Sequence, residues 1–137
     1  MDIILAAEGD LQALRQYDSH IPAARLLDCI RGGQVYALVD GPRILGLLRY
    51  SLFWQTIPFL DLLYIDEACR GKGHGRQMMA RWETEMADQG YPYVMLSTQA
   101  DETAKYFYEK LGYRSIGSFL PPEQEADEIL YLKEFGR

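Results

Sequence analysis

The sequence predicts an α/β protein with a mixed central sheet of about seven strands and helices on both faces. The predicted elements follow the order β-α-α-β-β-β-α-β-α-β-β. Residues 59–98 have the strand–helix–strand pattern of a right-handed parallel crossover. The chain has 137 residues, which is enough for one hydrophobic core flanked by helices. We therefore expect a single domain over residues 1–137.

The amino-terminal part contains one short strand and two amphipathic helices. Residues 3–6 are apolar and predict the strand, and residues 9–17 carry the apolar spacing of a helix. Pro22 stands near the start of the second helix, where proline is tolerated. The adjacent glycines 32–33 end that helix.

Three strands follow in succession. A strand over residues 35–39 is joined by a turn at residues 40–43 to a returning strand over residues 44–53. Another turn, at residues 55–58, leads to the strand over residues 59–65. This last strand is apolar nearly throughout, which is typical of a strand buried on both faces.

The carboxy-terminal half alternates helices with strands. The predicted elements are a helix from about residue 75 to residue 89, a strand at 93–98, a helix from 101 to 111, and strands at 113–119 and 128–133. We expect Asp101 to cap the second of these helices and Gly112 to end it.

Composition excludes several classes of function. The chain is 48% hydrophobic and 25% charged, which is ordinary for a globular protein. Its net charge is −6, whereas a nucleic-acid partner requires a basic surface to neutralise phosphates. We therefore expect no nucleic-acid partner. The acidic surplus favours solubility, and it would also attract a cationic substrate.

The cysteines and the apolar segments indicate the cellular location. Cys29 and Cys69 form neither a metal-ligand spacing nor a disulfide framework, so we expect no metal site. The first residues lack the basic region and apolar run of a signal peptide. No apolar stretch approaches the roughly 20 residues of a membrane span. We expect a cytoplasmic protein with reduced thiols and no membrane partner.

The most informative segment is a glycine-rich basic loop between an apolar strand and an amphipathic helix. It consists of Arg70, Gly71, Lys72, Gly73, His74, Gly75 and Arg76. Alternate glycines let the backbone approach a ligand closely. The following helix offers unpaired N–H groups and the positive end of its dipole. The loop is therefore suited to a phosphate or diphosphate.

Several ligands compete for such a loop. A Walker A loop requires serine or threonine after its lysine, and Gly73 follows Lys72 here. A dinucleotide-binding fold requires a different glycine spacing near the first strand. The diphosphate of coenzyme A remains as a ligand. A plain surface loop whose glycines end a strand is the competing structural interpretation.

Two segments carry a family resemblance. The pattern Arg-x-x-Gly-x-Gly at residues 70–75 resembles the pyrophosphate-binding motif of the GNAT superfamily of acyl-CoA-dependent N-acetyltransferases. Residues 104–113, AKYFYEKLGY, resemble the late helix and following strand of that family. The resemblance is specific from residue 59 to residue 114 and weaker elsewhere. It implies the single-domain GNAT fold and transfer of an acetyl group from acetyl-CoA to a primary amine.

The resemblance also implies where the coenzyme binds. In the family the fourth and fifth strands splay apart and admit the pantetheine arm. By analogy, the backbone of Leu63 and Ile65 would hydrogen-bond the pantetheine, and residues 70–76 would bind the pyrophosphate. An N–H near Leu63 to Ile65 would polarise the thioester carbonyl.

The predicted reaction needs an acid and a base. Tyr108 matches the tyrosine of the family that protonates the departing sulfur, although its helical spacing would also suit plain core packing. Asp61 is the candidate base, and strand alternation would place it on one face with Leu63 and Ile65. Burial would raise its pKa. A solvated Asp61 near the strand start is the equal alternative, and Glu67 is a weaker candidate.

Three further residues are singled out. His74 is a weak candidate base whose ring we expect to point to solvent. Trp54, at the predicted hairpin, is the candidate to face the acceptor. Asp101 stands where many family members have an asparagine that contacts the coenzyme, so the resemblance does not extend to that contact.

The predicted function is an N-acetyltransferase that acts on a small molecule, an amino acid derivative or a protein N-terminus. A homodimer would be in keeping with proteins of similar sequence. The alternatives are a non-catalytic acyl-CoA-binding or sensing module and a nucleotide-binding phosphotransferase. The missing Walker serine or threonine argues against the phosphotransferase, and Tyr108 argues against the non-catalytic module.

Overall fold

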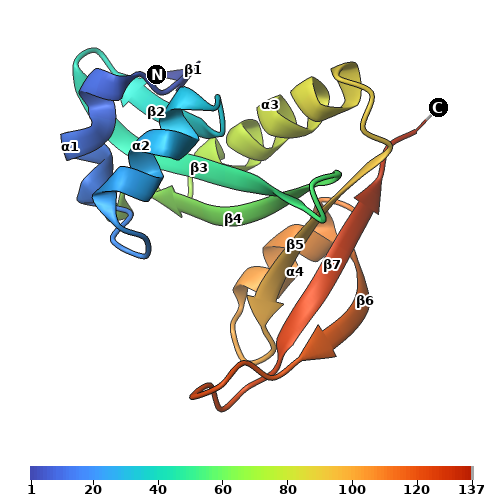
Figure 1. The fold of residues 1–137 in the computed structure, drawn as a ribbon. Coiled ribbons are helices and arrows are strands. Elements are labelled where there is room, and N and C mark those ends of the chain that lie inside the picture. Colours follow the sequence, from blue (N-terminus) through green and yellow to red (C-terminus); the bar gives the residue numbers. More distant parts are fainter. Residues whose placement is uncertain (137) are drawn as a thin grey trace. The chain divides into compact units, whose positions relative to one another are not determined.

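The computed structural model describes residues 1–136 and has the predicted α/β architecture. Within these residues, seven strands form one mixed sheet in the order β1-β2-β3-β4-β5-β7-β6 (Figure 1). The strands are β1 (Asp2–Leu5), β2 (Val35–Asp40), β3 (Arg43–Phe53), β4 (Ile57–Ile65), β5 (Tyr93–Gln99), β6 (Arg114–Phe119) and β7 (Glu128–Glu134). The helices are α1 (Leu11–Arg15), α2 (Ala23–Arg31), α3 (His74–Asp88) and α4 (Ala104–Lys110), with short 3-10 segments η1 (Glu8–Asp10) and η2 (Glu67–Cys69). None of these helices is long and apolar enough to cross a membrane.

The chain forms two compact units, which are described separately. The first contains Met1–Ser51 and Asp61–Thr84. The second contains Leu52–Leu60 and the chain from Glu85 onward. The α/β class and the mixed seven-stranded sheet are confirmed, whereas a single domain over the whole chain stays a prediction.

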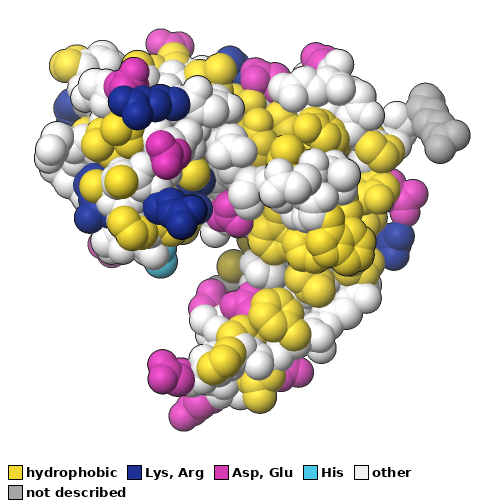
Figure 2. Space-filling view, in the orientation of Figure 1, with side chains coloured by type: hydrophobic (Ala, Val, Ile, Leu, Met, Phe, Trp, Pro, Cys, Tyr) yellow, Lys and Arg dark blue, Asp and Glu magenta, His cyan; other side chains and the backbone are white. Residues whose placement is uncertain are grey.

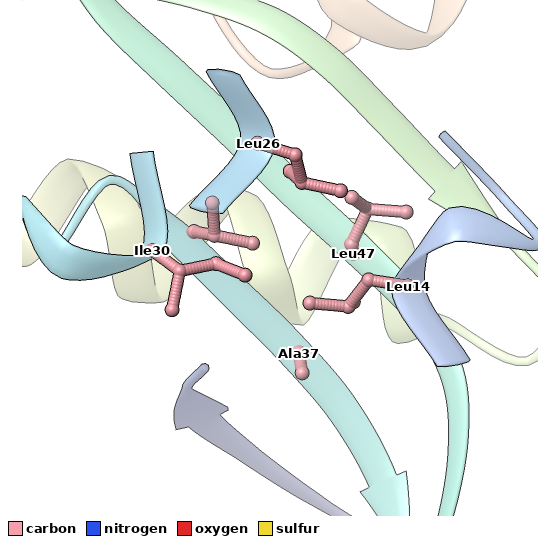
Figure 3. Close-up of a cluster of buried hydrophobic side chains, with 6 residues drawn as sticks. Leu14, Leu26, Ile30, Ala37 and Leu47 are labelled. Atoms are coloured by element: carbon pink, nitrogen blue, oxygen red, sulfur yellow. The ribbon is translucent and has the colours of Figure 1, made fainter. Parts of the chain in front are cut away.

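In the first unit, helices α1 and α2 cover one face of β2 and β3. These strands are antiparallel, and β1 adds to β2 with Ile3 opposite Leu38. The apolar side chains of the helices and strands point toward one another in Figure 3. The buried cluster consists of Leu14, Leu26, Ile30, Val35, Ala37 and Leu47. Burying these side chains removes apolar surface from water and fixes the helices on the sheet.

The opposite face of β2 and β3 is covered by the first turns of α3. Met78, Met79 and Trp82 lie at helical spacing and are buried. The ring of Trp82 packs 5.8 Å from that of Tyr50 on β3, centroid to centroid. Helices therefore cover both faces of this part of the sheet, as predicted.

In the second unit, β5, β7 and β6 form an antiparallel ribbon. Leu96 on β5 pairs with Tyr131 on β7. Near its start β4 runs parallel to β5, with Phe59 opposite Met95. Helix α4 is tied to β7 by the Tyr131 hydroxyl, which donates to Glu109 Oε2 at 2.9 Å.

Two of the predicted boundaries that differ from the structure have a clear physical cause. The residue that precedes α4 as its N-cap is Thr103, not Asp101, because the Glu102 N–H first closes a turn onto the Gln99 carbonyl at 3.1 Å. Strand β4 begins at Ile57, before the predicted start at Phe59, because the β3–β4 hairpin turns within two residues. Neither difference changes the order of the elements.

Candidate active site

The segment after β4 is anchored to the first unit by Tyr17 and Asp66. The Tyr17 hydroxyl donates to Asp66 Oδ2 at 2.8 Å and lies 3.2 Å from the Ile44 carbonyl oxygen. The other carboxylate oxygen of Asp66 accepts the Ala68 N–H at 3.0 Å, and the Asp66 N–H donates to the Leu45 carbonyl at 2.7 Å. The hydrogen bond from Tyr17, and then that from Ala68, lowers the pKa of Asp66 below 3.8. Burial, followed by the hydrogen bond to Asp66, raises the pKa of Tyr17 to about 12.

Arg70 holds the glycine loop against the strand end. Its Nε donates to the Ile65 carbonyl at 2.9 Å. Its guanidinium carbon lies 5.0 Å from the centroid of the Tyr64 ring, a cation–π distance. This arrangement fixes the direction in which the chain leaves β4. A direct contact of Arg70 with a diphosphate stays a prediction.

The loop itself is an open backbone cradle. Gly71 and Gly73 have φ values of 77° and 87°, in the left-handed region that favours glycine. Within residues 1–136, and apart from the adjacent residues, no heavy atom lies within 4 Å of a Cβ built on either glycine. Lys72 and Arg76 are exposed. Backbone and basic side chains are therefore accessible to an anion over this stretch.

Helix α3 begins at the end of this cradle. The Gln77 N–H donates to the Gly73 carbonyl at 3.1 Å, which starts the helical hydrogen-bond ladder. The N–H groups of His74, Gly75 and Arg76 precede that ladder and have no intrahelical acceptor. They also lie at the positive end of the helix dipole. The arrangement suits a phosphate group.

We expected the ring of His74 to point to solvent, but the residue is half-buried. Its Nδ1 is buried and has no hydrogen-bond partner within residues 1–136. A buried ring nitrogen without a partner is costly, so it is a place where a bound group would add a hydrogen bond. The backbone of His74 stays a predicted diphosphate contact.

Leu63 and Ile65 lie in the last part of β4 and are half-buried. The parallel register of β4 with β5 covers the pairs Phe59–Met95 and Leu60–Leu96, and Leu63 and Ile65 lie beyond it. The carbonyl of Ile65 is engaged by Arg70. The predicted hydrogen bonds of these residues to pantetheine stay a prediction.

Asp61 is part of a partly buried charge cluster. Its Oδ2 lies 3.5 Å from Arg49 Nη1, and its side chain is 26% exposed. Burial raises the pKa of Asp61 above 3.8, while a hydrogen bond with Ser51 and the charge of Arg49 oppose that rise. Arg49 in turn donates from Nε to Asp18 Oδ2 at 2.7 Å. The sequence left burial and solvation of Asp61 open. The residue as a whole is exposed, and its side chain, at 26% exposure, is partly shielded by the cluster, so neither alternative is decided.

The prediction that Asp61 shares a face with Leu63 and Ile65 is wrong. Asp61 contacts Arg49 on the face of the sheet covered by α1 and α2. Leu62 and Tyr64 pack against the hydrophobic cluster on that same face. Strict alternation is therefore interrupted between Asp61 and Leu62.

Tyr108 belongs to the second unit and is buried on α4. Its ring packs edge-on against Phe107 and Tyr113, with centroid distances of 5.0 and 5.9 Å. Burial raises the pKa of Tyr108 to about 12. The phenol is therefore protonated at neutral pH, as a hydrogen donor must be.

Comparison with known proteins identifies the family. The model of the acetyltransferase (GNAT) family matches residues 7–113. The chain belongs to this family. Blasticidin-S acetyltransferase of Streptomyces morookaense is 28% identical over 102 residues, which cover 72% of each chain.

Solved structures of GNAT-fold proteins superpose over nearly the whole chain. Ard1 from Thermoplasma volcanium has a TM-score of 0.84 at 19% identity, covering 99% of this chain and 98% of that one. The structure of yncA from Salmonella typhimurium with its cofactor acetyl-CoA has a TM-score of 0.83 at 15% identity, covering 100% and 95%. The fold of this chain is therefore that of a GNAT acetyltransferase, an enzyme that uses acetyl-CoA as its acyl donor.

The residues of the GNAT loop fit a diphosphate. A side chain at Gly71 or Gly73 would project into the space that the bare backbone leaves open for the ligand. The buried, unpartnered Nδ1 of His74 lies at the end of the same loop.

Trp54 lies at the tip of the β3–β4 hairpin of the acetyltransferase and is 77% exposed. Trp54 and Gln55 have φ values of 56° and 62°, and the Thr56 N–H donates to the Phe53 carbonyl at 3.1 Å. This is the geometry of a type I′ turn, which normally carries Asn and Gly. Contact of Trp54 with an acceptor stays a prediction.

A cavity of about 690 Å³ lies in the second unit, and none of the predicted site residues lines it. It is bounded by the end of α3, the start of β5 and the end of β7. Its position gives no support for the predicted chemistry.

Sequence reasoning missed Tyr17, Asp18 and Arg49. Arg49 was detectable in principle, because it is a cation between Leu48 and Tyr50 in an otherwise apolar strand. A buried cation requires a partner. The identity of that partner was not detectable, since Asp18 lies 31 positions away in the chain.

Proposed function

We propose that this acetyltransferase transfers the acetyl group of acetyl-CoA to a primary amine that is a cation in solution. The observation that carries the proposal is the open cradle of Gly71 and Gly73 directly before α3. An apolar strand, a bare backbone turn and a helix N-terminus in succession are suited to a diphosphate.

In this proposal the residues of the loop have different roles. The N–H groups of His74, Gly75 and Arg76 donate to the diphosphate, and Lys72 adds positive charge in a chain of net charge −6. Arg70 keeps the loop in place through the Ile65 carbonyl. Leu63 and Ile65 would then offer backbone groups to the pantetheine arm.

Acetyl-CoA supplies an acetyl group on a thioester, which a free amine attacks directly. An alkyl amine has a pKa of about 10.4, so it must first lose a proton. Asp61 is the proposed acceptor of that proton, directly or through a water. Its partial burial supports this role, because burial raises the pKa of Asp61 and makes the carboxylate a stronger base.

Tyr108 is the proposed donor to the sulfur that leaves. A phenol with a pKa of about 12 is a weak acid toward a solvated thiolate. Burial raises the pKa of a thiol as well, since it disfavours the anion of either group. If the phenol and the sulfur share an apolar environment, both pKa values are raised, so the difference between them is again small enough for proton transfer.

Charge supports a cationic acceptor. The connection between β6 and β7 carries exposed Glu123, Glu125 and Asp127, and acidic side chains gather at its tip in Figure 2. A negative surface raises the local concentration of a cation. The name of blasticidin-S acetyltransferase indicates a small-molecule acceptor for that relative, and we include blasticidin S among the compounds to test.

Calorimetry and thiol release test the proposal together. We expect acetyl-CoA to bind and ATP to bind far more weakly. Thiol release should follow when amines are added, with polyamines, amino acid amides, peptides with a free N-terminus and blasticidin S as the panel. Binding of acetyl-CoA without release for any amine would favour the non-catalytic module. Equal affinity for ATP would contradict the assignment of the loop.

A further inference from the structure

Arg49 lies between two carboxylates in the first unit. Its Nε is 2.7 Å from Asp18 Oδ2 and its Nη1 is 3.5 Å from Asp61 Oδ2. The side chain of Asp18 is fully buried and that of Arg49 is 9% exposed. Asp61 is the most exposed member, at 26%. The guanidinium therefore links a buried anion to one that a solute can reach.

The geometry of the arginine makes this link directional. A guanidinium presents its N–H groups in a rigid planar fork, so fixing one edge also fixes the other. The closer contact is with Asp18, so Asp18 sets the orientation of the fork. The fork in turn offers Nη1 to Asp61, and the cluster of two carboxylates and one guanidinium has a net charge of −1.

We propose that Asp18 and Arg49 are positioning residues that set the orientation and the charge state of Asp61, the amine-side carboxylate of the reaction. This inference rests on the proposed function of Asp61 as the proton acceptor. Neither Asp18 nor Arg49 needs to touch a substrate. They act through the side chain of Asp61 alone.

The groups that surround Asp61 push its ionisation in opposite directions. Arg49, from β3, favours the carboxylate. Asp18, from the connection after α1, disfavours it by like charge. His20 lies 3.3 Å from Asp18 and is largely exposed, and Cys29 of α2 also interacts with the cluster. Removing the cation and removing the buried anion should therefore change Asp61 in opposite senses.

Paired variants test this directly. In Arg49→Met, the acidic limb of the kcat/KM profile should move to higher pH by about one unit, because Asp61 loses its cation. In Asp18→Asn, the acidic limb of the kcat/KM profile should move to lower pH, because Arg49 then interacts with Asp61 alone. The amine substrate is the same in each assay, so its own titration cancels in the comparison.

Controls separate positioning from a structural role. Arg31→Met removes an exposed ion pair with Glu8 and should leave the limb in place. His20→Gln should also leave it in place, and a limb that vanishes in this variant would overturn the inference. Shifts of the same sign in Arg49→Met and Asp18→Asn, or no shift in either, would overturn it as well.

A measurement that does not depend on turnover can test the cluster even if the proposed function is wrong. A replacement variant keeps the test possible if a single variant does not fold. The carboxyl ¹³C resonance of Asp61, assigned by its loss in Asp61→Asn, should titrate at higher pH in Arg49→Met and lower pH in Asp18→Asn. Such shifts without any thiol release would support the cluster and contradict the acetylation of amines. If a single variant does not fold, the double variant Asp18→Asn with Arg49→Met replaces it, and its Asp61 resonance should titrate at higher pH. An unchanged resonance would overturn the inference.

Discussion

Replacing Gly46 with alanine should displace the strand end that leads into the glycine loop. Gly46 lies in β3 at the point where β4 passes closely. A Cβ at this position would lie 2.6 Å from the Tyr64 carbonyl oxygen and 3.1 Å from Ile65 Cδ1. The first of these atoms belongs to the backbone, so rotation of a side chain cannot relieve the contact.

The size of the effect follows from the overlap. Ordinary van der Waals contact begins at 3.4 Å, so the strands must separate by 0.8 Å locally. Forcing extra volume into a packed site costs about 1–3 kcal/mol. Loss of chain freedom in the unfolded state offsets this by about 0.4–1 kcal/mol for Gly to Ala. We therefore expect Gly46→Ala to lower the free energy of unfolding by about 1–2 kcal/mol.

The same displacement should weaken coenzyme binding. The Asp66 N–H bonds to the Leu45 carbonyl next to Gly46, and Arg70 bonds to the Ile65 carbonyl. Urea unfolding and calorimetry with coenzyme A measure the two effects. Gly117→Ala is the matched control, because an added Cβ at this strand glycine meets no atom of the described part of the chain within 4 Å, apart from its two neighbours. If the free energies of unfolding of the two variants differ by less than about 0.5 kcal/mol, the close approach of β4 to Gly46 is refuted.

Four further variants test other parts of the account. Tyr108→Phe should lower kcat while the Kd for acetyl-CoA is unchanged, and full retention of kcat would remove Tyr108 as the donor. Gln55→Gly should stabilise the hairpin by about 1 kcal/mol, because glycine relieves a left-handed φ, with no loss of activity. Trp54→Asn should stabilise it similarly but lower the affinity for the acceptor, and unchanged KM would remove Trp54 from the acceptor site. Asp61→Asn should abolish activity yet stabilise the fold at neutral pH. Because burial raises the folded-state pKa of Asp61 above 3.8, the protonated form stabilises the fold below 3.8, and this contribution is lost as the pH rises through the folded pKa. The difference in stability between the wild type and Asp61→Asn should therefore vanish in acid, and a difference that grows in acid would contradict the sign.

The fold was predictable because its signals are local and periodic. The apolar runs at residues 35–39 and 44–53 and the helical spacing of Met78, Met79 and Trp82 each depend on neighbours within a few positions. The glycine loop was equally visible, since Gly71 and Gly73 do adopt left-handed φ values.

The rest depended on contacts between distant residues. The ion pair of Asp18 with Arg49 joins positions 31 apart, and no periodicity encodes it. The interrupted alternation after Asp61 follows from packing against the first unit's core rather than from residue type. The tip of the β3–β4 hairpin has Trp54 and Gln55 where type I′ turns usually have Asn and Gly, so the sequence predicted a turn at residues 55–58 but not its type or its two-residue length.

The amide ¹H–¹⁵N shifts of residues 71–76 during titration with coenzyme A and with pantetheine give the most direct measurement. Coenzyme A should move these amide resonances strongly, and pantetheine, which lacks the diphosphate, should leave them nearly unchanged. Gly117 serves as an internal reference in the same spectra. If saturating coenzyme A leaves the amides of this turn where they were, the turn does not bind the diphosphate.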